Sequence, residues 1–248
     1  MFGRAIDKYA SPQNAYALAS SLAPWFGWIT LILLLAGLWG SLVYAPPDYD
    51  QGESFRIIYL HVPSAWMSMF IYVVMAAAGA VGLVWKVKLM DAVARGCAPI
   101  GAIFTFLTLV TGMLWGKPMW GTWWVWDARL TSELILLFLY LGYMALQAAI
   151  DDRRTAARAG AVLALVGVVN IPIIHFSVEW WNTLHQGPTI TRMDGPSIHI
   201  SMLIPLVVMA LAFKTYFITS LLLRVRCEIL EQEKNASWVR ELAVAERD

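Results

Sequence analysis

The chain has 248 residues, of which 59% are hydrophobic and only 14% are charged. This composition is too apolar for a soluble domain, whose helices would carry polar faces at the helical period. The formal net charge of +1 says nothing about partners, and no strongly basic run suggests that the protein binds nucleic acid.

Charged residues divide the chain into six long apolar runs. Each is long enough to cross a hydrocarbon core of ~30 Å at ~1.5 Å per residue, and only helices satisfy their backbone within lipid. We therefore predict an all-α integral membrane protein with six transmembrane helices, forming one polytopic domain over residues 1–248. The predicted helices cover 25–44, 57–85, 96–116, 134–150 (beginning nearer Leu130), 159–178 and 198–223.

Lysine and arginine predict the orientation of these helices. Thirteen of the 18 basic residues fall on one predicted side, four on the other and one, Lys214, within a span. The side richer in basic residues faces the cytoplasm. Both termini are therefore expected in the cytoplasm, with a lead-in at 1–24 and an amphipathic tail at 224–248.

The first outward connection, residues 45–56, is rich in Pro, Gly and Asp and is expected to be irregular. It leads to His61, which we expect just before the second helix, whose first turn suits Pro63. Later in the chain, Thr131 and Ser132 offer N-cap oxygens for the fourth helix. The residue before Pro172 marks an expected irregularity in the fifth helix.

The segment 115–130, WGKPMWGTWWVWDARL, is the most unusual part of the chain. Its tryptophans exceed what membrane anchoring requires and suggest a platform for a large, flat, hydrophobic ligand at the outer surface. Trp120, Trp123, Trp124 and Asp127 are spaced as on one helical face, which predicts a short helix lying in the interface. Asp127 either orients a neighbouring N–H or arginine, or caps or pairs within the connection. The platform residues are Trp115, Trp120, Trp123, Trp124 and Trp126.

All four histidines map to the outward side, namely His61, His175, His185 and His199. A zinc or copper site would require three or four closely set ligands, and the chain has neither an H-x-x-H nor a C-x-x-C pair. Haem requires one or two axial imidazoles, an apolar or aromatic surface, and cations for its propionates. Position favours His61 and His185 as the axial pair, because they lie on connections, but leaves His175 and His199 open.

The run WGKPMWGTWWVWDARLTSE resembles the WWD signature of proteins that handle haem during c-type cytochrome assembly. With six helices, one histidine before the second and another after the fifth, the chain resembles the cytochrome c maturation protein C (CcmC) family over essentially its whole length. The resemblance implies non-covalent haem b at the periplasmic face of the bacterial inner membrane, with iron held by His61 and His185. The matching motif positions are Arg56, Trp115, Trp120, Asp127 and Arg129.

The resemblance also implies a function and partners. Haem would be delivered to a periplasmic haem chaperone for c-type cytochrome biogenesis. The protein would work beside ABC-type ATPase and permease subunits and a small single-helix membrane subunit. We expect a haem-handling protein rather than an enzyme, without catalytic residues, at most assisting covalent attachment of haem to the chaperone.

The positions of the cysteines and the lack of a nucleotide-binding motif agree with a protein that relies on partners for covalent haem attachment and for ATP hydrolysis. Cys97 and Cys227 both map to the cytoplasmic side and no C-x-x-C-H run exists, so covalent c-type haem on this chain is not expected. No P-loop is present, so any ATP dependence must come from partners. Two alternatives remain open: a membrane electron-transfer b-type cytochrome that uses His175 and His199, and a transporter subunit with no haem of its own.

Overall fold

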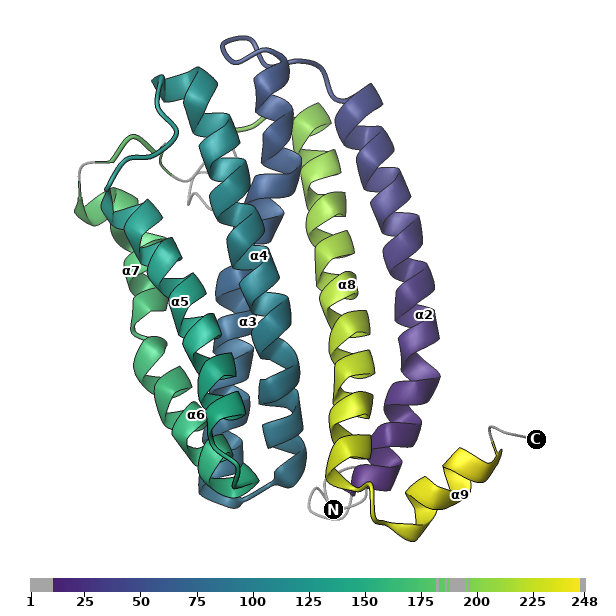
Figure 1. Ribbon diagram of the computed structural model, residues 1–248. Coiled ribbons are helices and arrows are strands. Elements are labelled where there is room, and N and C mark those ends of the chain that lie inside the picture. Colours follow the sequence, from purple (N-terminus) through teal and green to yellow (C-terminus); the bar gives the residue numbers. More distant parts are fainter. Residues whose placement is uncertain (1–10, 182, 186, 188–194, 196, 246–248) are drawn as a thin grey trace.

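The computed structural model describes residues 11–181, 183–185, 187, 195 and 197–245. The long elements form an antiparallel bundle (Figure 1), confirming the expected all-α architecture. Within the described ranges, six helical segments are long and apolar enough to cross a membrane, as in a multi-pass membrane protein. They are Pro12–Tyr44, Glu53–Trp85, Lys88–Trp120, Ala128–Ala149, Arg153–Trp180 and Ile200–Gln232.

The first two spans each contain a non-α turn. Helix α2 (Pro12–Trp39) starts at an N-cap, where Ser11 accepts from the backbone N–H of Asn14 and proline follows. It continues as one π-helical turn, η1 (Gly40–Tyr44), and a 3-10 turn, η2 (Glu53–Ile57), precedes α3 (Ile58–Trp85). The other helices are α4 (Lys88–Trp120), α5 (Ala128–Ala149), α6 (Arg153–Gly167), α7 (Asn170–Trp180), α8 (Ile200–Gln232) and α9 (Ser237–Ala245).

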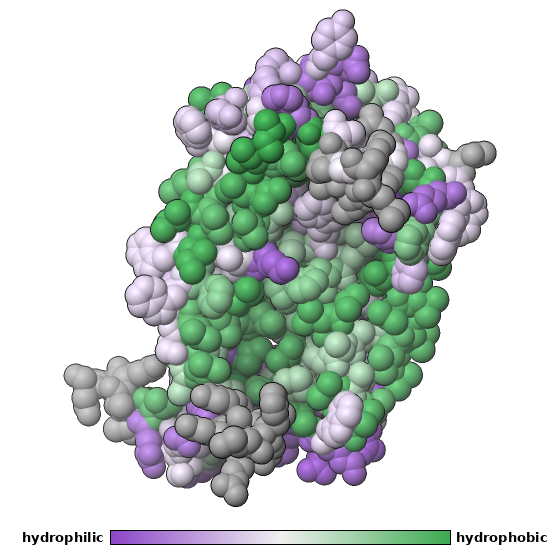
Figure 2. Space-filling view, turned by 180° about the vertical axis from the view of Figure 1, so that it is seen from behind, coloured by the Kyte–Doolittle hydropathy of each residue, from purple (hydrophilic) through white to green (hydrophobic). Residues whose placement is uncertain are grey.

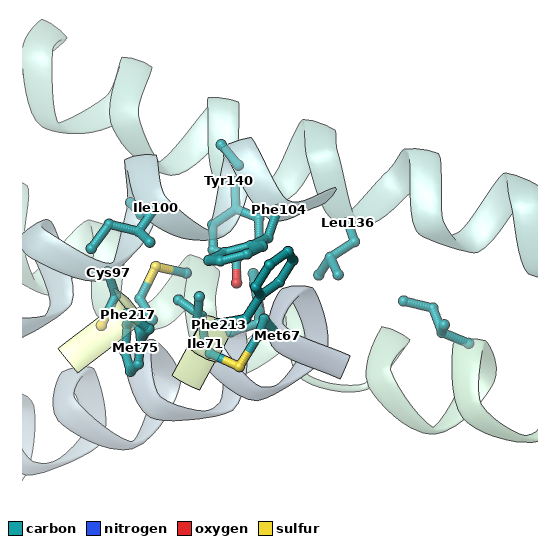
Figure 3. Close-up of a cluster of buried hydrophobic side chains, with 14 of the residues drawn as sticks. Met67, Ile71, Met75, Cys97, Ile100, Phe104, Leu136, Tyr140, Phe213 and Phe217 are labelled. Atoms are coloured by element: carbon teal, nitrogen blue, oxygen red, sulfur yellow. The ribbon is translucent and has the colours of Figure 1, made fainter. Parts of the chain in front are cut away.

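Helices α3 and α4 form the centre of the bundle. Both contact α8, while α5 packs on α4, α6 packs on α3 and α5, and α2 packs mainly on α8 at one side (Figure 1). Figure 3 shows the interior that they share, built from thioether, aromatic and aliphatic side chains. It includes Met67, Ile71 and Met75 of α3, Phe104 of α4, Tyr140 of α5, and Phe213 and Phe217 of α8.

Close helix contacts depend on glycine at particular positions. A Cβ at Gly101 of α4 would lie 2.1 Å from Tyr140 Cζ, so only glycine leaves room for that ring. The Tyr140 hydroxyl then donates to the Ser68 carbonyl on α3 at 2.8 Å. One tyrosine thus joins three helices at the centre of the bundle.

The two ends of the bundle differ from its middle. Figure 2 shows apolar side chains over most of the middle of one face, with polar side chains gathered toward the ends. We call the end formed by residues 45–57, residues 121–127 and the start of α8 the tryptophan end. The opposite end, formed by residues 86–87, residues 150–152 and the start of α2, is called the basic end.

Several helices begin or end outside the apolar runs that predict them. The first helix begins at Pro12, so residues 12–24 are helical and continuous with the first apolar run; residues 1–10 lie outside the described part. The third helix begins at Lys88, since isolated charges near a helix end do not stop it. Within the expected tail, residues 224–232 continue α8, and Val225 and Ile229 pack against Ala15.

The short interfacial helix expected through Trp120 and Asp127 is also absent. Helix α4 ends at Trp120 because Gly121 adopts a left-handed φ of 76°, and residues 122–127 form no helix. Asp127, rather than Thr131 or Ser132, is the N-cap of α5 and accepts from the Leu130 N–H at 2.8 Å. His61 lies within α3 rather than before it, because η2 and α3 begin earlier than expected.

The break expected near Pro172 is confirmed. Val168 and Val169 separate α6 from α7, so the fifth span consists of two helices. Pro172 lies in the first turn of α7, where its missing N–H would have no partner within the helix.

Candidate functional site

His61 lies at the tryptophan end of α3 and is held by a threonine of α4. Its Nδ1 is 3.0 Å from Thr111 Oγ1, while the Thr111 hydroxyl donates its single proton to the Leu107 carbonyl at 2.6 Å. A hydroxyl engaged in this way accepts from His61, which favours the tautomer with the proton on Nδ1. This tautomer leaves the lone pair on Nε2, which is the form that binds a metal.

Trp115 packs against the same imidazole. The two rings meet edge to face with centroids 5.7 Å apart, and Phe55 contacts Trp115 from another side at 6.1 Å. The indole N–H donates to Gln51 Oε1 at 2.8 Å. Trp115 is thus fixed in orientation as well as in position, one helical turn beyond Thr111.

His185 is held by the tryptophan-rich connection. Trp120 meets its ring with centroids 4.9 Å apart, and Asp127 Oδ2 lies 3.7 Å from its Nδ1. Nδ1 is buried and makes no hydrogen bond within the described residues. A carboxylate facing Nδ1 favours the proton on that atom, so His185 too presents Nε2 as the free lone pair.

Asp127 links three parts of the site. It caps α5, accepts a hydrogen bond from Thr183 Oγ1, and faces His185, while its own side chain is only 4% exposed. Burial alone would raise the pKa of this carboxyl, but His185, Thr183 and the Leu130 N–H hold the pKa below its ordinary value of 3.8. Both roles considered for Asp127, capping a helix and orienting a neighbour, are therefore present together.

Arg56 and Arg129, the two arginines among the matching motif positions, are largely engaged by the fold. Arg56 donates to the carbonyls of Ser41 and of Ala45, the latter at 3.0 Å, and pairs with Glu53. Arg129 donates Nε to Ser177 Oγ and Nη2 to the His175 carbonyl, both at 3.1 Å. A guanidinium has five N–H donors, so each arginine keeps donors for a ligand.

The three remaining tryptophans lie away from the histidine contacts. Trp123 is 53% exposed beneath the Lys117 ammonium, and Trp126 is 76% exposed. Trp124 meets Trp126 edge-on, and its Nε1 is buried without a hydrogen-bond partner among the described residues. The five indoles thus form two inner rings, each against a histidine, and an outer group of three.

Both histidines lie at the tryptophan end, where Trp115 and Trp120 of α4 contact one imidazole each. No group of three or more His, Cys, Asp or Glu suited to a metal ion occurs within the described ranges. The arrangement instead offers two imidazoles, each with Nδ1 facing an oxygen and each against an indole.

A family model described as heme exporter protein C matches residues 5–240. This chain belongs to the CcmC family. The match confirms the resemblance seen in the tryptophan-rich run.

Curated relatives of the CcmC family align over nearly the whole chain. Heme exporter protein C of Haemophilus influenzae is 53% identical over 96% of this chain and 97% of its own length. The Escherichia coli K12 protein of the same name is 53% identical over 96% of both chains. A mitochondrial ccmC-like protein of cytochrome c biosynthesis from Marchantia polymorpha is 48% identical over 79% of this chain and 80% of its own length.

In this CcmC-family chain the other two histidines have different surroundings. His175 of α7 is exposed, meets Phe176 edge-on, and lines an apolar groove between α3 and α7. His199 is the N-cap of α8, where its Nδ1 accepts from the Ser201 N–H at 3.3 Å. Arg192, one of the four basic residues on the predicted outer side, lies outside the described residues.

Three residues that position the site were missed from the sequence: Gln51, Thr111 and Thr183. Thr183 carried a usable signal, since a threonine two residues before His185 commonly accepts its backbone N–H, here at 3.1 Å. Thr111 lies one turn before Trp115 on α4, so it shares that helix face. The hydrogen bond of Gln51 to Trp115 joins residues far apart in the chain, so no local sequence pattern predicts it.

Proposed function

We propose that this protein takes part in haem export for c-type cytochrome biogenesis by binding haem non-covalently at the tryptophan end. The proposal is carried by one observation: both His61 and His185 have Nδ1 facing an oxygen and the ring against an indole, which favours the tautomer with its lone pair on Nε2. The printed names of the relatives, heme exporter protein C, support the same cargo.

Haem would supply an iron that accepts an axial nitrogen on each face. On the protein side, Nε2 of His61 and of His185 are the donors, and Trp115 and Trp120 keep the two imidazoles in place. Trp123, Trp124 and Trp126 offer further apolar area for the macrocycle. The unused guanidinium donors of Arg56 and Arg129 are the candidates for the propionates.

Delivery requires a site that a second protein can reach. His185 keeps 18% of its side chain exposed, and Trp126 projects from the same connection. We propose that haem passes from here to a periplasmic haem chaperone at the outer face of the bacterial inner membrane. ABC-type ATPase and permease subunits and a small single-helix subunit are the proposed companions of this step.

The visible spectrum of the purified protein tests haem binding. His61→Ala and His185→Ala should each change the absorption of bound haem and lower its retention through gel filtration, because each removes one axial nitrogen. His199→Ala is the matched control, since that ring caps α8. If neither His61→Ala nor His185→Ala altered the spectrum while His175→Ala or His199→Ala did, the proposed ligand pair would be wrong.

A further inference from the structure

A second feature lies at the basic end, far along the helices from the tryptophans. A cavity of about 240 Å³ opens there between α4, α5 and α8. Arg95 and Pro99 come from α4, Met144 and Gln147 from α5, and Arg224 and Glu228 from α8. Nothing in the proposed haem site uses these residues.

The cavity holds two cations without contact partners. Arg95 is half-buried and Arg224 is exposed, and neither makes a hydrogen bond or a contact ion pair within the described part of the chain. Asp91, four residues earlier on α4, forms no contact ion pair with Arg95 in the described part of the chain. Two arginines against the one carboxylate of Glu228 leave the lining with a net charge of +1, so an anion close to both guanidinium groups would be stabilised.

The same cavity holds two acceptors that lack donors. Gln147 gives its Nε2 proton to the Ala156 carbonyl at 2.8 Å, which leaves Oε1 buried and without a donor. Glu228 Oε2 is likewise buried without a hydrogen bond, and its closest cation, Arg153, lies 3.7 Å away. Unmet acceptors of this kind cost free energy unless a ligand or water supplies donors.

The depth of the cavity suits a lipid headgroup. Arg95 lies seven residues into α4, roughly 10 Å along the helix axis, and Gln147 lies two residues before the end of α5. The apolar members, Pro99 and Met144, fit the glycerol and the first acyl carbons. Basic pockets between spanning helices at this level bind phospholipid headgroups.

We propose that this cavity binds one phospholipid whose phosphate is followed by a hydrogen-bond donor. The phosphate accepts from Arg95 and Arg224, and the donor reaches Gln147 Oε1 and Glu228 Oε2. Phosphatidylglycerol supplies hydroxyls and phosphatidylethanolamine supplies an ammonium, whereas phosphatidylcholine has the phosphate but no donor. The cavity shares no residue with the proposed haem site, so this proposal and the proposed function can be tested separately.

Lipid titration of the delipidated, detergent-purified protein tests the site. Thermal unfolding and native mass spectrometry are followed with phosphatidylglycerol, phosphatidylethanolamine, phosphatidylcholine or inorganic phosphate. The first two should raise the unfolding temperature and remain bound as one molecule per chain, unlike the last two. Equal stabilisation by phosphatidylcholine, or by inorganic phosphate alone, would overturn the proposal.

Two substitutions locate the effect. Arg95→Gln should weaken phosphatidylglycerol binding by about tenfold, the loss of one charge-assisted contact. Arg158→Gln removes the same charge from an exposed position on α6 outside the cavity and should have no effect. Equal effects of the two variants would mean that only the general charge of this end matters.

A third variant keeps the proposal testable if Arg95→Gln does not fold. Glu228→Gln removes the negative charge that opposes a phosphate and attracts an ammonium. It should strengthen phosphatidylglycerol binding and weaken phosphatidylethanolamine binding. Unchanged binding of both lipids would show that Glu228 does not face the headgroup.

Discussion

At the scale of single residues, the proton on each imidazole decides what the tryptophan end can bind. The Thr111 hydroxyl donates its only proton to the Leu107 carbonyl, and it therefore faces His61 as an acceptor, which favours the proton of His61 on Nδ1. Asp127 favours the same state in His185 through its charge. In the proposed function, an imidazole with its proton on Nδ1 offers the lone pair of Nε2 to iron.

Substitutions at Asp127 separate its two roles. Asparagine caps helices about as well as aspartate, whereas alanine costs about 0.5–2 kcal/mol of helix stability. Asp127→Asn should therefore keep most of the unfolding stability near neutral pH but lose haem in gel filtration, because its amide carries no charge toward His185. Asp127→Ala should lose both. If Asp127→Asn retained haem as well as the unsubstituted protein does, Asp127 would only cap α5 and would have no role in orienting His185.

The pH dependence of stability has a defined sign at this residue. The pKa of Asp127 is lower in the folded protein than its ordinary value of 3.8, so ionised Asp127 stabilises the fold. That contribution is fully present above pH 3.8 and is lost as the pH falls through the lowered pKa. The small excess of stability that the protein has over Asp127→Asn at pH 6 should therefore disappear only below pH 3.8, as unfolding midpoints in detergent measure.

At the scale of elements, the centre of the bundle contains a carboxyl group. Glu133 of α5 is 4% exposed and accepts from Ser68 Oγ of α3 at 2.8 Å, its one hydrogen bond to any described residue. The same serine hydroxyl also lies 2.9 Å from the Ala65 carbonyl. The hydroxyl has one proton to share, so the carboxyl depends on Ser68 more than Ser68 depends on the carboxyl.

A double-substitution cycle tests this asymmetry. Ser68→Ala should lower the free energy of unfolding by about 1–3 kcal/mol, because it strands a buried acceptor. Adding Glu133→Leu should recover most of that loss by removing the group that was stranded. The cycle is measured by thermal unfolding in detergent. Additive effects of the two substitutions would show that Ser68 and Glu133 do not interact.

The elements also show which features the sequence could predict. Uncharged runs bracketed by charges locate all six spans, because a membrane span must be apolar along its length. The helical spacing from Trp120 to Asp127 predicted a short helix that is absent. That prediction assumed that the helix continues through Gly121, but Gly121 ends α4. The contact of His185 with Asp127 joins two connections far apart in the chain, so no local pattern carries it.

At the scale of the whole molecule, the bundle separates two chemically different ends. The tryptophan end gathers His61, His185 and five indoles, while the basic end carries the phospholipid cavity and the start of α2. Basic residues predict that the tryptophan end faces away from the cytoplasm. Because the spans alternate in direction, one measurement at each end is sufficient to decide the orientation.

Thiol accessibility tests this orientation. Cys227 is an exposed thiol near the basic end of α8, whereas Cys97 is buried. Tyr49, fully exposed at the tryptophan end, offers a second position as Tyr49→Cys in a Cys227→Ser background. A membrane-impermeant thiol reagent added to spheroplasts should label position 49 at once and Cys227 only after the membrane is opened. The reverse pattern would invert the topology.

The same two positions give the most direct test of where haem binds. A fluorescent dye is attached at Cys227 or at Tyr49→Cys, and quenching by energy transfer is followed as haem is added. Cys227 lies 28 residues along α8 from His199, roughly 40 Å at 1.5 Å per residue. Haem held by His61 and His185 should quench the dye at position 49 far more strongly than the dye at Cys227. Stronger quenching at Cys227 would place haem at the basic end and contradict the account.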